Sequence, residues 1–65
     1  MKKRDLEREL RKLGWYFKRE GGCHEIWTDG EETMPVPRHK EVNENTARGI
    51  IRDILEIKEK KKKGY

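Results

Sequence analysis

Residues 15–30 read WYFKREGGCHEIWTDG, and this stretch decides the fold. Two runs that contain aromatic residues, 15–20 and 23–28, flank Gly21-Gly22, and the turn-forming pair Asp29-Gly30 follows the second run. Runs of this kind separated by glycine turns are typical of antiparallel strands. Residues 33–37, TMPVP, add a third short strand, and their two prolines place it at a sheet edge because each removes a ladder donor. We therefore predict a small three-stranded antiparallel sheet between residues 15 and 37.

The alternation of side chains along these strands leaves the position of the histidine open. A period of two groups Trp15 with Phe17 on one face of the first strand, and His24 with Ile26 on one face of the second. The other face of the second strand carries Cys23, Glu25 and Trp27. Because apolar residues lie on both faces, the pattern does not decide which face His24 occupies.

Two amphipathic helices are expected, one before and one after the sheet region in the sequence. Between Lys2 and Leu13, leucines recur at helical spacing, and Gly14 follows as a stop signal. Asn43 is a predicted cap for a second helix from about Glu44 to Lys60. The residues expected in the core are Leu6, Leu10, Leu13, Ile50, Ile51, Ile54 and Leu55. The order helix, three strands, helix predicts an α+β domain with both helices on one sheet face, which is the α-β-β-β-α order of the double-stranded RNA-binding fold.

Composition limits the size of the core and the kind of partner. A chain of 65 residues forms a single small domain, 1–65, and domains near this size bury only about 60% of the surface of the unfolded chain. With 31% hydrophobic and 46% charged residues the chain approaches the composition of disordered proteins, but its aromatic residues and its Ile/Leu-rich C-terminal half predict a folded core. The net charge of +4 suits a polyanion, either nucleic acid or an acidic protein.

Several classes of protein are excluded by what the sequence lacks. A single cysteine cannot form an internal disulfide, and Cys and His form no cluster with metal-ligand spacing. The N-terminus is charged rather than apolar, and no apolar run approaches the roughly 20 residues needed to cross a bilayer. We expect a cytoplasmic protein that uses no metal or other cofactor and does not enter a membrane.

Two charged segments allow alternative interpretations. Lys2, Lys3, Arg4 and Arg8 in the first helix form either a solvated face or a surface that lies along phosphates. Residues 58–65 are almost purely charged before Gly64-Tyr65, which predicts a fraying helix end or a disordered tail that adds nonspecific attraction to phosphate.

The candidate functional residue is His24, which directly follows the glycine turn. Glycines permit positive φ and allow another backbone, such as a phosphodiester, to approach closely. Histidine has an unperturbed pKa of about 6.5 and can therefore take or give a proton near neutrality. A lone histidine after a turn is more often an ordinary strand residue, so the case for catalysis depends on its surroundings.

Two short motifs occur in a fixed order, Gly22-Cys23-His24 and Val36-Pro37-Arg38-His39. Together with Gly14-Trp15, Arg19 and residues 45–51 of the second helix, they resemble the HicA family of toxins across nearly the whole chain. The family more usually has serine where this chain has Cys23. We expect Cys23 to be a small buried hydrophobe rather than a reactive thiol.

The resemblance implies the toxin of a HicAB toxin-antitoxin pair, an endoribonuclease that cleaves mRNA without the ribosome and without a metal. It also implies a HicB-type antitoxin that covers the active face, and a catalytic role for His24. His39 matches a recurrent family histidine, and we expect it to help cap the second helix or to touch phosphate. The expected phosphate-binding residues are Lys18, Arg19, Gly22, Arg38, His39 and Lys40.

Two other functions remain open from the sequence. A noncatalytic module could grip an RNA duplex by its shape, with His24 as a plain strand residue. A small basic subunit could instead dock an acidic protein. Trp15, Tyr16 and Trp27 could stack on bases if they are exposed, although such residues are more often part of the core.

Overall fold

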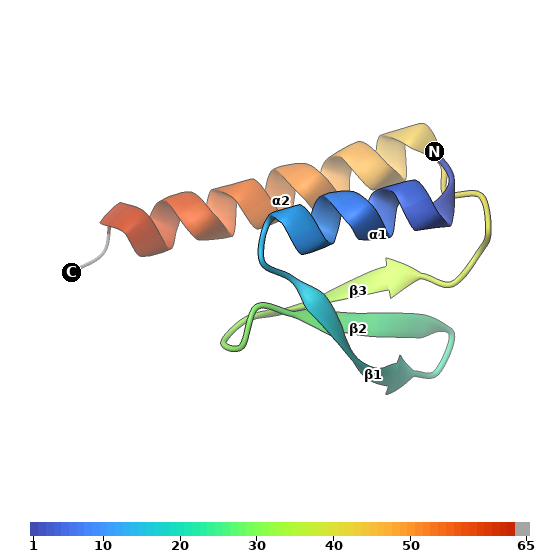
Figure 1. Cartoon of the computed structure of the whole chain (residues 1–65), viewed down its shortest axis with the longest axis horizontal. Coiled ribbons are helices and arrows are strands. Elements are labelled where there is room, and N and C mark those ends of the chain that lie inside the picture. Colours follow the sequence, from blue (N-terminus) through green and yellow to red (C-terminus); the bar gives the residue numbers. More distant parts are fainter. Residues whose placement is uncertain (64–65) are drawn as a thin grey trace.

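The computed structural model describes the backbone of residues 1–63 and the side chains as far as Lys61. Its elements are α1 (Lys3–Lys12), β1 (Tyr16–Gly21), β2 (His24–Thr28), β3 (Thr33–Pro37) and α2 (Glu44–Lys63). This order confirms the predicted α-β-β-β-α fold, with three antiparallel strands and two helices. Both helices lie on the same side of the sheet and run in the same direction, and α2 extends well past the end of α1 (Figure 1).

The sheet is a meander of order β1-β2-β3, so β2 is central. The proline-containing strand β3 lies at an edge, as predicted, with Pro35 opposite Ile26 and Pro37 opposite His24. On the other edge, the register between β1 and β2 shifts after Phe17, which leaves Lys18 as the extra residue of a β-bulge.

Local signals explain where α1 ends and where α2 begins. Gly14 follows the C-cap of α1 with φ of 89°, a conformation that glycine adopts without strain. At the start of α2, the Oδ1 atom of Asn43 accepts a hydrogen bond from the backbone N–H of Asn45 at 2.8 Å. The predicted cap is therefore present, and such caps are worth about 1 kcal/mol.

The core lies between the two helices and the sheet. Its buried hydrophobic residues are Leu6, Leu10, Trp15, Trp27, Val36, Val42, Ala47, Ile50 and Ile54. Leu13 and Ile51, also predicted in the core, are partly buried against it. The prediction for Leu55 was wrong, because its side chain is 46% exposed. The buried stripe of α2 follows positions 47, 50 and 54, and Leu55 is displaced from it by one residue, or about 100° around the helix.

The register places Phe17 opposite Trp27, and therefore on the helix-facing side where Trp15 is also buried, but the two side chains differ in exposure. Trp15 is 3% exposed, whereas Phe17 is 45% exposed. The strand begins only at Tyr16, and the backbone N–H of Trp15 donates to the carbonyl of Leu10 at 2.9 Å. Trp15 therefore belongs to the turn that ends α1 rather than to the strand.

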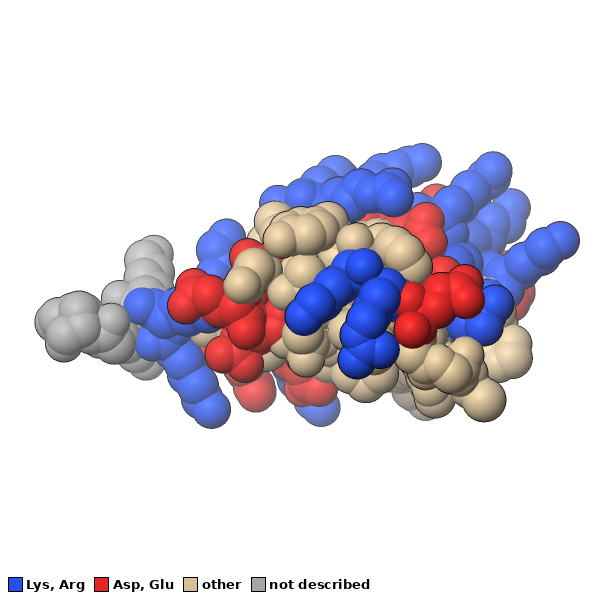
Figure 2. Space-filling model, turned by 90° about the horizontal axis from the view of Figure 1, so that it is seen from below, with Lys and Arg blue, Asp and Glu red and all other residues tan. Residues whose placement is uncertain are grey.

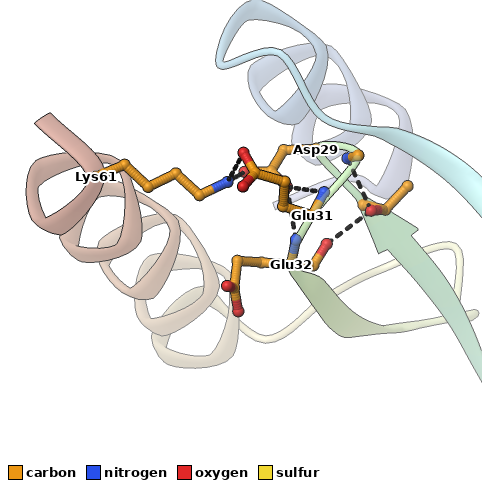
Figure 3. Close-up of polar contacts among 6 residues, drawn as sticks. Asp29, Glu31, Glu32 and Lys61 are labelled. Atoms are coloured by element: carbon orange, nitrogen blue, oxygen red, sulfur yellow. Dashed lines mark hydrogen bonds and ion pairs between the residues drawn. The ribbon is translucent and has the colours of Figure 1, made fainter. Parts of the chain in front are cut away.

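The charged segment that begins at Lys58 is helical as far as Lys63, whereas residues 64 and 65 lie outside the described residues. Near its end, the Lys61 ammonium forms ion pairs with Asp29 and with Glu31 in the β2–β3 turn (Figure 3). The Asp29 carboxylate also accepts the backbone N–H groups of Glu31 and Glu32 at 2.9 and 2.8 Å. The far end of α2 is thus tied to the sheet.

Candidate functional site

The β1–β2 turn carries the candidate histidine. Gly21 pairs with His24, so the loop between the strands contains only two residues, Gly22 and Cys23. Gly22 has φ of +67°, and no described residue other than glycine has positive φ. Positive φ at the first loop position alone is the signature of a type II′ turn, which favours glycine there. The turn fixes His24 as the first residue of β2.

His24 lies on the sheet face that is turned away from the helices. Trp27 on β2 is buried in the core, and its indole N–H donates to the carboxylate of Glu25 at 3.0 Å, so these two side chains share the helix-facing side. Since successive strand residues point to opposite faces, His24 and Ile26 point to the other side. The His24 side chain is exposed, and among the described side chains it makes no hydrogen bond or ion pair. Its imidazole is accessible to a ligand.

Arg38, the first residue after β3, contacts the turn directly. Its Nη1 donates to the carbonyl of Gly22 at 3.1 Å, and its Nη2 lies 3.6 Å from the carboxylate of Glu20. A guanidinium has five N–H donors in a planar fork, so these contacts leave donors for an anion. The structure therefore brings together three of the sequence-predicted site residues, Gly22, His24 and Arg38.

The remaining basic candidates surround this group less closely. Lys18 is exposed in the bulge of β1, and Arg19 is exposed opposite Ile26, on the same face as His24. His39 and Lys40 are exposed in the loop that leads to α2. In the described part of the chain, the hydrogen bond that caps α2 comes from Asn43, and His39 makes none.

Two side chains differ from their predicted environments. Cys23 was expected to be buried, but it is exposed, because it occupies the second position of a two-residue turn that projects beyond the sheet. Trp15 and Trp27 are buried and cannot stack on bases, whereas Tyr16 is 52% exposed. Of the three aromatic residues considered for stacking, only Tyr16 is on the surface.

Sequence reasoning missed a polar cluster beneath the turn. The Lys3 ammonium lies 2.8 Å from the carboxylate of Glu25, which also accepts the Trp27 N–H. Burial opposes ionisation of Glu25, but the hydrogen bonds from Lys3 and Trp27, with the charges of Lys3 and Arg38, outweigh it and lower its pKa. The sequence signal that could have revealed this cluster is Glu25, which lies two residues before Trp27 and therefore on the same face of the strand. A carboxylate that is partly buried beside an apolar side chain requires a hydrogen-bonding or charged partner.

Two features are absent from the described residues. These residues contain no group of three or more His, Cys, Asp or Glu side chains placed to hold a metal ion. None of their helices combines the length and the apolar character needed to span a membrane.

The fold and the turn define a small basic α+β protein with the topology of a double-stranded RNA-binding domain, and with an exposed histidine after a turn that an arginine contacts. Residues 4–55, well over half of the chain, match the family model described as the HicA toxin of bacterial toxin-antitoxin. The chain belongs to the HicA toxin family and is the toxin of a toxin-antitoxin pair. No curated protein and no solved structure matches it.

Proposed function

We propose that this toxin is an endoribonuclease that cleaves mRNA independently of the ribosome, with His24 as its catalytic proton-transfer group. The observation that supports the proposal best is the accessible imidazole on the open face of the sheet, directly after a type II′ turn whose Gly22 carbonyl is bound by Arg38. Toxins of the HicA family generally cleave mRNA, which also supports it. The proposed setting is the cytoplasm, as part of a stress response in which a HicB-type antitoxin inhibits the enzyme.

In RNA cleavage of this kind the RNA supplies the nucleophile, and the protein supplies proton transfer and positive charge. The 2′-hydroxyl attacks the phosphorus, the bond to the 5′-oxygen breaks, and the products are a 2′,3′-cyclic phosphate and a 5′-hydroxyl. A base must remove the 2′ proton, an acid must protonate the departing oxygen, and cations must stabilise the charge on the phosphate. His24 would perform one of the two proton transfers, a contribution of about 10²–10⁴-fold in rate.

The surrounding residues have roles that follow from their positions. Arg38 would hold the reacting phosphate with the donors not engaged by Gly22 and Glu20, because a guanidinium matches two phosphate oxygens at once. The absence of a side chain at Gly22 leaves open space at the turn for the RNA backbone. Lys18, Arg19, His39 and Lys40 would contact flanking phosphates.

The test is His24→Ala, measured for both RNA cleavage and thermal stability. We expect cleavage to fall by at least about 10²-fold while the melting temperature and RNA affinity stay near those of the parent, because an exposed strand residue contributes little to the core. His39→Ala removes the other imidazole of the chain and, as the loss of a phosphate contact, should weaken RNA affinity while leaving the cleavage rate at saturating RNA near that of the parent. A chelator should leave cleavage by the parent unchanged.

The same experiment distinguishes the alternatives. A stable His24→Ala protein that cuts at the parent rate would end the catalytic assignment. RNA binding without cleavage by the parent would indicate a noncatalytic module, and neither binding nor cleavage would indicate a subunit that docks an acidic protein.

A further inference from the structure

A hollow of about 460 Å³ lies between the first turn of α1 and the loop that follows β3. Its lining residues are Lys2, Lys3, Arg4, Glu7, Lys40 and Glu41. The hollow is fixed by backbone contacts between its two walls. The N–H of Lys3 donates to the carbonyl of Lys40 at 2.8 Å, and Lys2 forms a β-bridge with Glu41. Its shape is therefore present before any ligand binds.

The acidic residues of the hollow already have cationic partners. Glu7 lies 3.1 Å from the Lys3 ammonium, and Glu41 lies 3.8 Å from the amino group of Met1. By contrast, Lys2, Arg4 and Lys40 are exposed and form no ion pair within the described part of the chain. Three cations from two segments thus face one hollow without compensation. Their mutual repulsion is relieved when an anion enters.

The hollow lies at the same end of the molecule as the candidate active site. Lys40 is two residues after Arg38, which contacts the turn, and Lys3 reaches Glu25, the residue after His24. In Figure 1 the N-terminus, the end of β3 and the β1–β2 turn are all at the right. Several Lys and Arg side chains project at that end in Figure 2, with Asp and Glu among them, and others are spread over the rest of the view. The 38–40 loop separates the hollow, on the helix side, from His24 on the open face of the sheet.

We propose that this hollow binds a backbone phosphate of the RNA substrate, one that is near in the RNA chain to the phosphate bound at His24. The proposal rests on the proposed function, and it extends the RNA path around the end of the sheet and past the 38–40 loop. A phosphodiester chain can supply one anion to each of two nearby cationic sites. The hollow has room for a single phosphate with its sugar.

The experiment compares two triple variants with the same loss of charge. The hollow variant carries Lys2→Gln, Arg4→Gln and Lys40→Gln. The control variant carries Arg48→Gln, Arg52→Gln and Lys58→Gln, all exposed on α2. Both are made in a His24→Ala background so that bound RNA stays intact. Affinity for a labelled single-stranded RNA is measured over a range of salt concentrations, and circular dichroism monitors folding.

For the hollow variant we expect about 10-fold weaker RNA binding at low salt. The slope of log K against log salt concentration should become shallower by about 0.7, which corresponds to the loss of one phosphate contact with single-stranded RNA. The control variant should keep the parent slope. If the hollow variant unfolds, Arg4→Gln alone provides the same comparison against Arg48→Gln.

Each result has a defined meaning. Equal slopes for the two variants would overturn the phosphate site and leave the proposed function untouched. A shallower slope for the hollow variant together with no cleavage by the parent would support the site and overturn the endonuclease. Weakened antitoxin binding with an unchanged RNA slope would identify the hollow as a protein-docking site and overturn the proposal, and a parent that binds no RNA would overturn both.

Discussion

Gly22 shows how one residue without a side chain controls the placement of another residue's chemistry. Its φ of +67° costs an L-residue about 1–2 kcal/mol, whereas glycine adopts it freely. A methyl group at this position would meet nothing within 4 Å, so backbone strain is the only penalty. Relief of that strain would change the turn and therefore the direction of His24.

Gly22→Ala should lower the free energy of unfolding by about 1 kcal/mol and reduce RNA cleavage, because the turn no longer holds His24 in place. Gly49→Ala is the matched control. Gly49 lies within α2, has no atom within 4 Å of an added methyl, and should gain about 0.5–1 kcal/mol. Urea unfolding and cleavage assays of both variants provide the comparison. Changes of the same sign in the two free energies would contradict the argument from φ.

The sequence predicted single residues correctly where their role depends on the backbone conformation of their neighbours in the chain. Gly22 at the turn, Gly14 after α1 and Asn43 as a cap are of this kind. The contact of Arg38 with the Gly22 carbonyl was not predictable. It joins positions 16 residues apart through a long side chain, whose direction no local pattern fixes.

Among the elements, α2 has a stabilising contact near its far end with a residue outside the helix. A run of lysines at a helix end repels itself and favours fraying, which is what the sequence alone predicted. The Asp29 carboxylate offsets this repulsion by pairing with Lys61 in the structure. Burial opposes ionisation of Asp29, but Lys61 and the N–H groups of Glu32 and Glu31 lower its pKa to about 2.

Stability should therefore depend on Asp29 in acid. Because its pKa is about 2 when folded against an ordinary 3.8, its contribution is complete above about pH 4 and is lost as the pH falls toward 2. We expect Asp29→Asn to cost about 1 kcal/mol at pH 7, after allowance for solvent screening, and to flatten the decline of stability between pH 4 and 2.

Thermal unfolding at several pH values measures this effect. Lys61→Gln should reproduce part of it, whereas Lys60→Gln, an equal change of charge one residue away, should not. An Asp29→Asn protein with the parent's acid profile would show that the pairing contributes nothing.

For the whole molecule, the arrangement of charge suggests how a partner controls activity. The accessible His24, Arg38 and the hollow near Lys40 lie at one end, so a single partner placed there covers all of them. If the antitoxin presents acidic residues to this end, it and RNA compete for the same cations.

Competition has a measurable consequence. Addition of antitoxin to a complex of the His24→Ala toxin with labelled RNA should release the RNA completely at saturation, and toxin–antitoxin affinity should decline with salt. A stable ternary complex detected by size-exclusion chromatography would show that the antitoxin binds elsewhere. The Arg48, Arg52 and Lys58 triple variant serves as the control for changes in net charge.

The overall architecture was the most predictable level. Hydrophobic periodicity and turn residues predicted every element and the antiparallel sheet, because these signals are repeated over many positions. The face occupied by His24 was not predictable, since Ile26 and Trp27 gave both faces of β2 an apolar residue. The choice is made by packing, because only the Trp27 side is covered by helices.

The prolines of β3 have a consequence for how the molecule behaves at high concentration. A proline has no N–H, so positions 35 and 37 must direct their backbone groups away from β2, toward the outer edge. At that edge, a strand from another molecule would meet backbone carbonyl acceptors but no N–H donor at positions 35 and 37. On the opposite edge, the bulge at Lys18 interrupts the row of β1 and places a charge there. Both edges are therefore poor templates for a second sheet, and we expect the toxin released from its partner to resist aggregation through its strands.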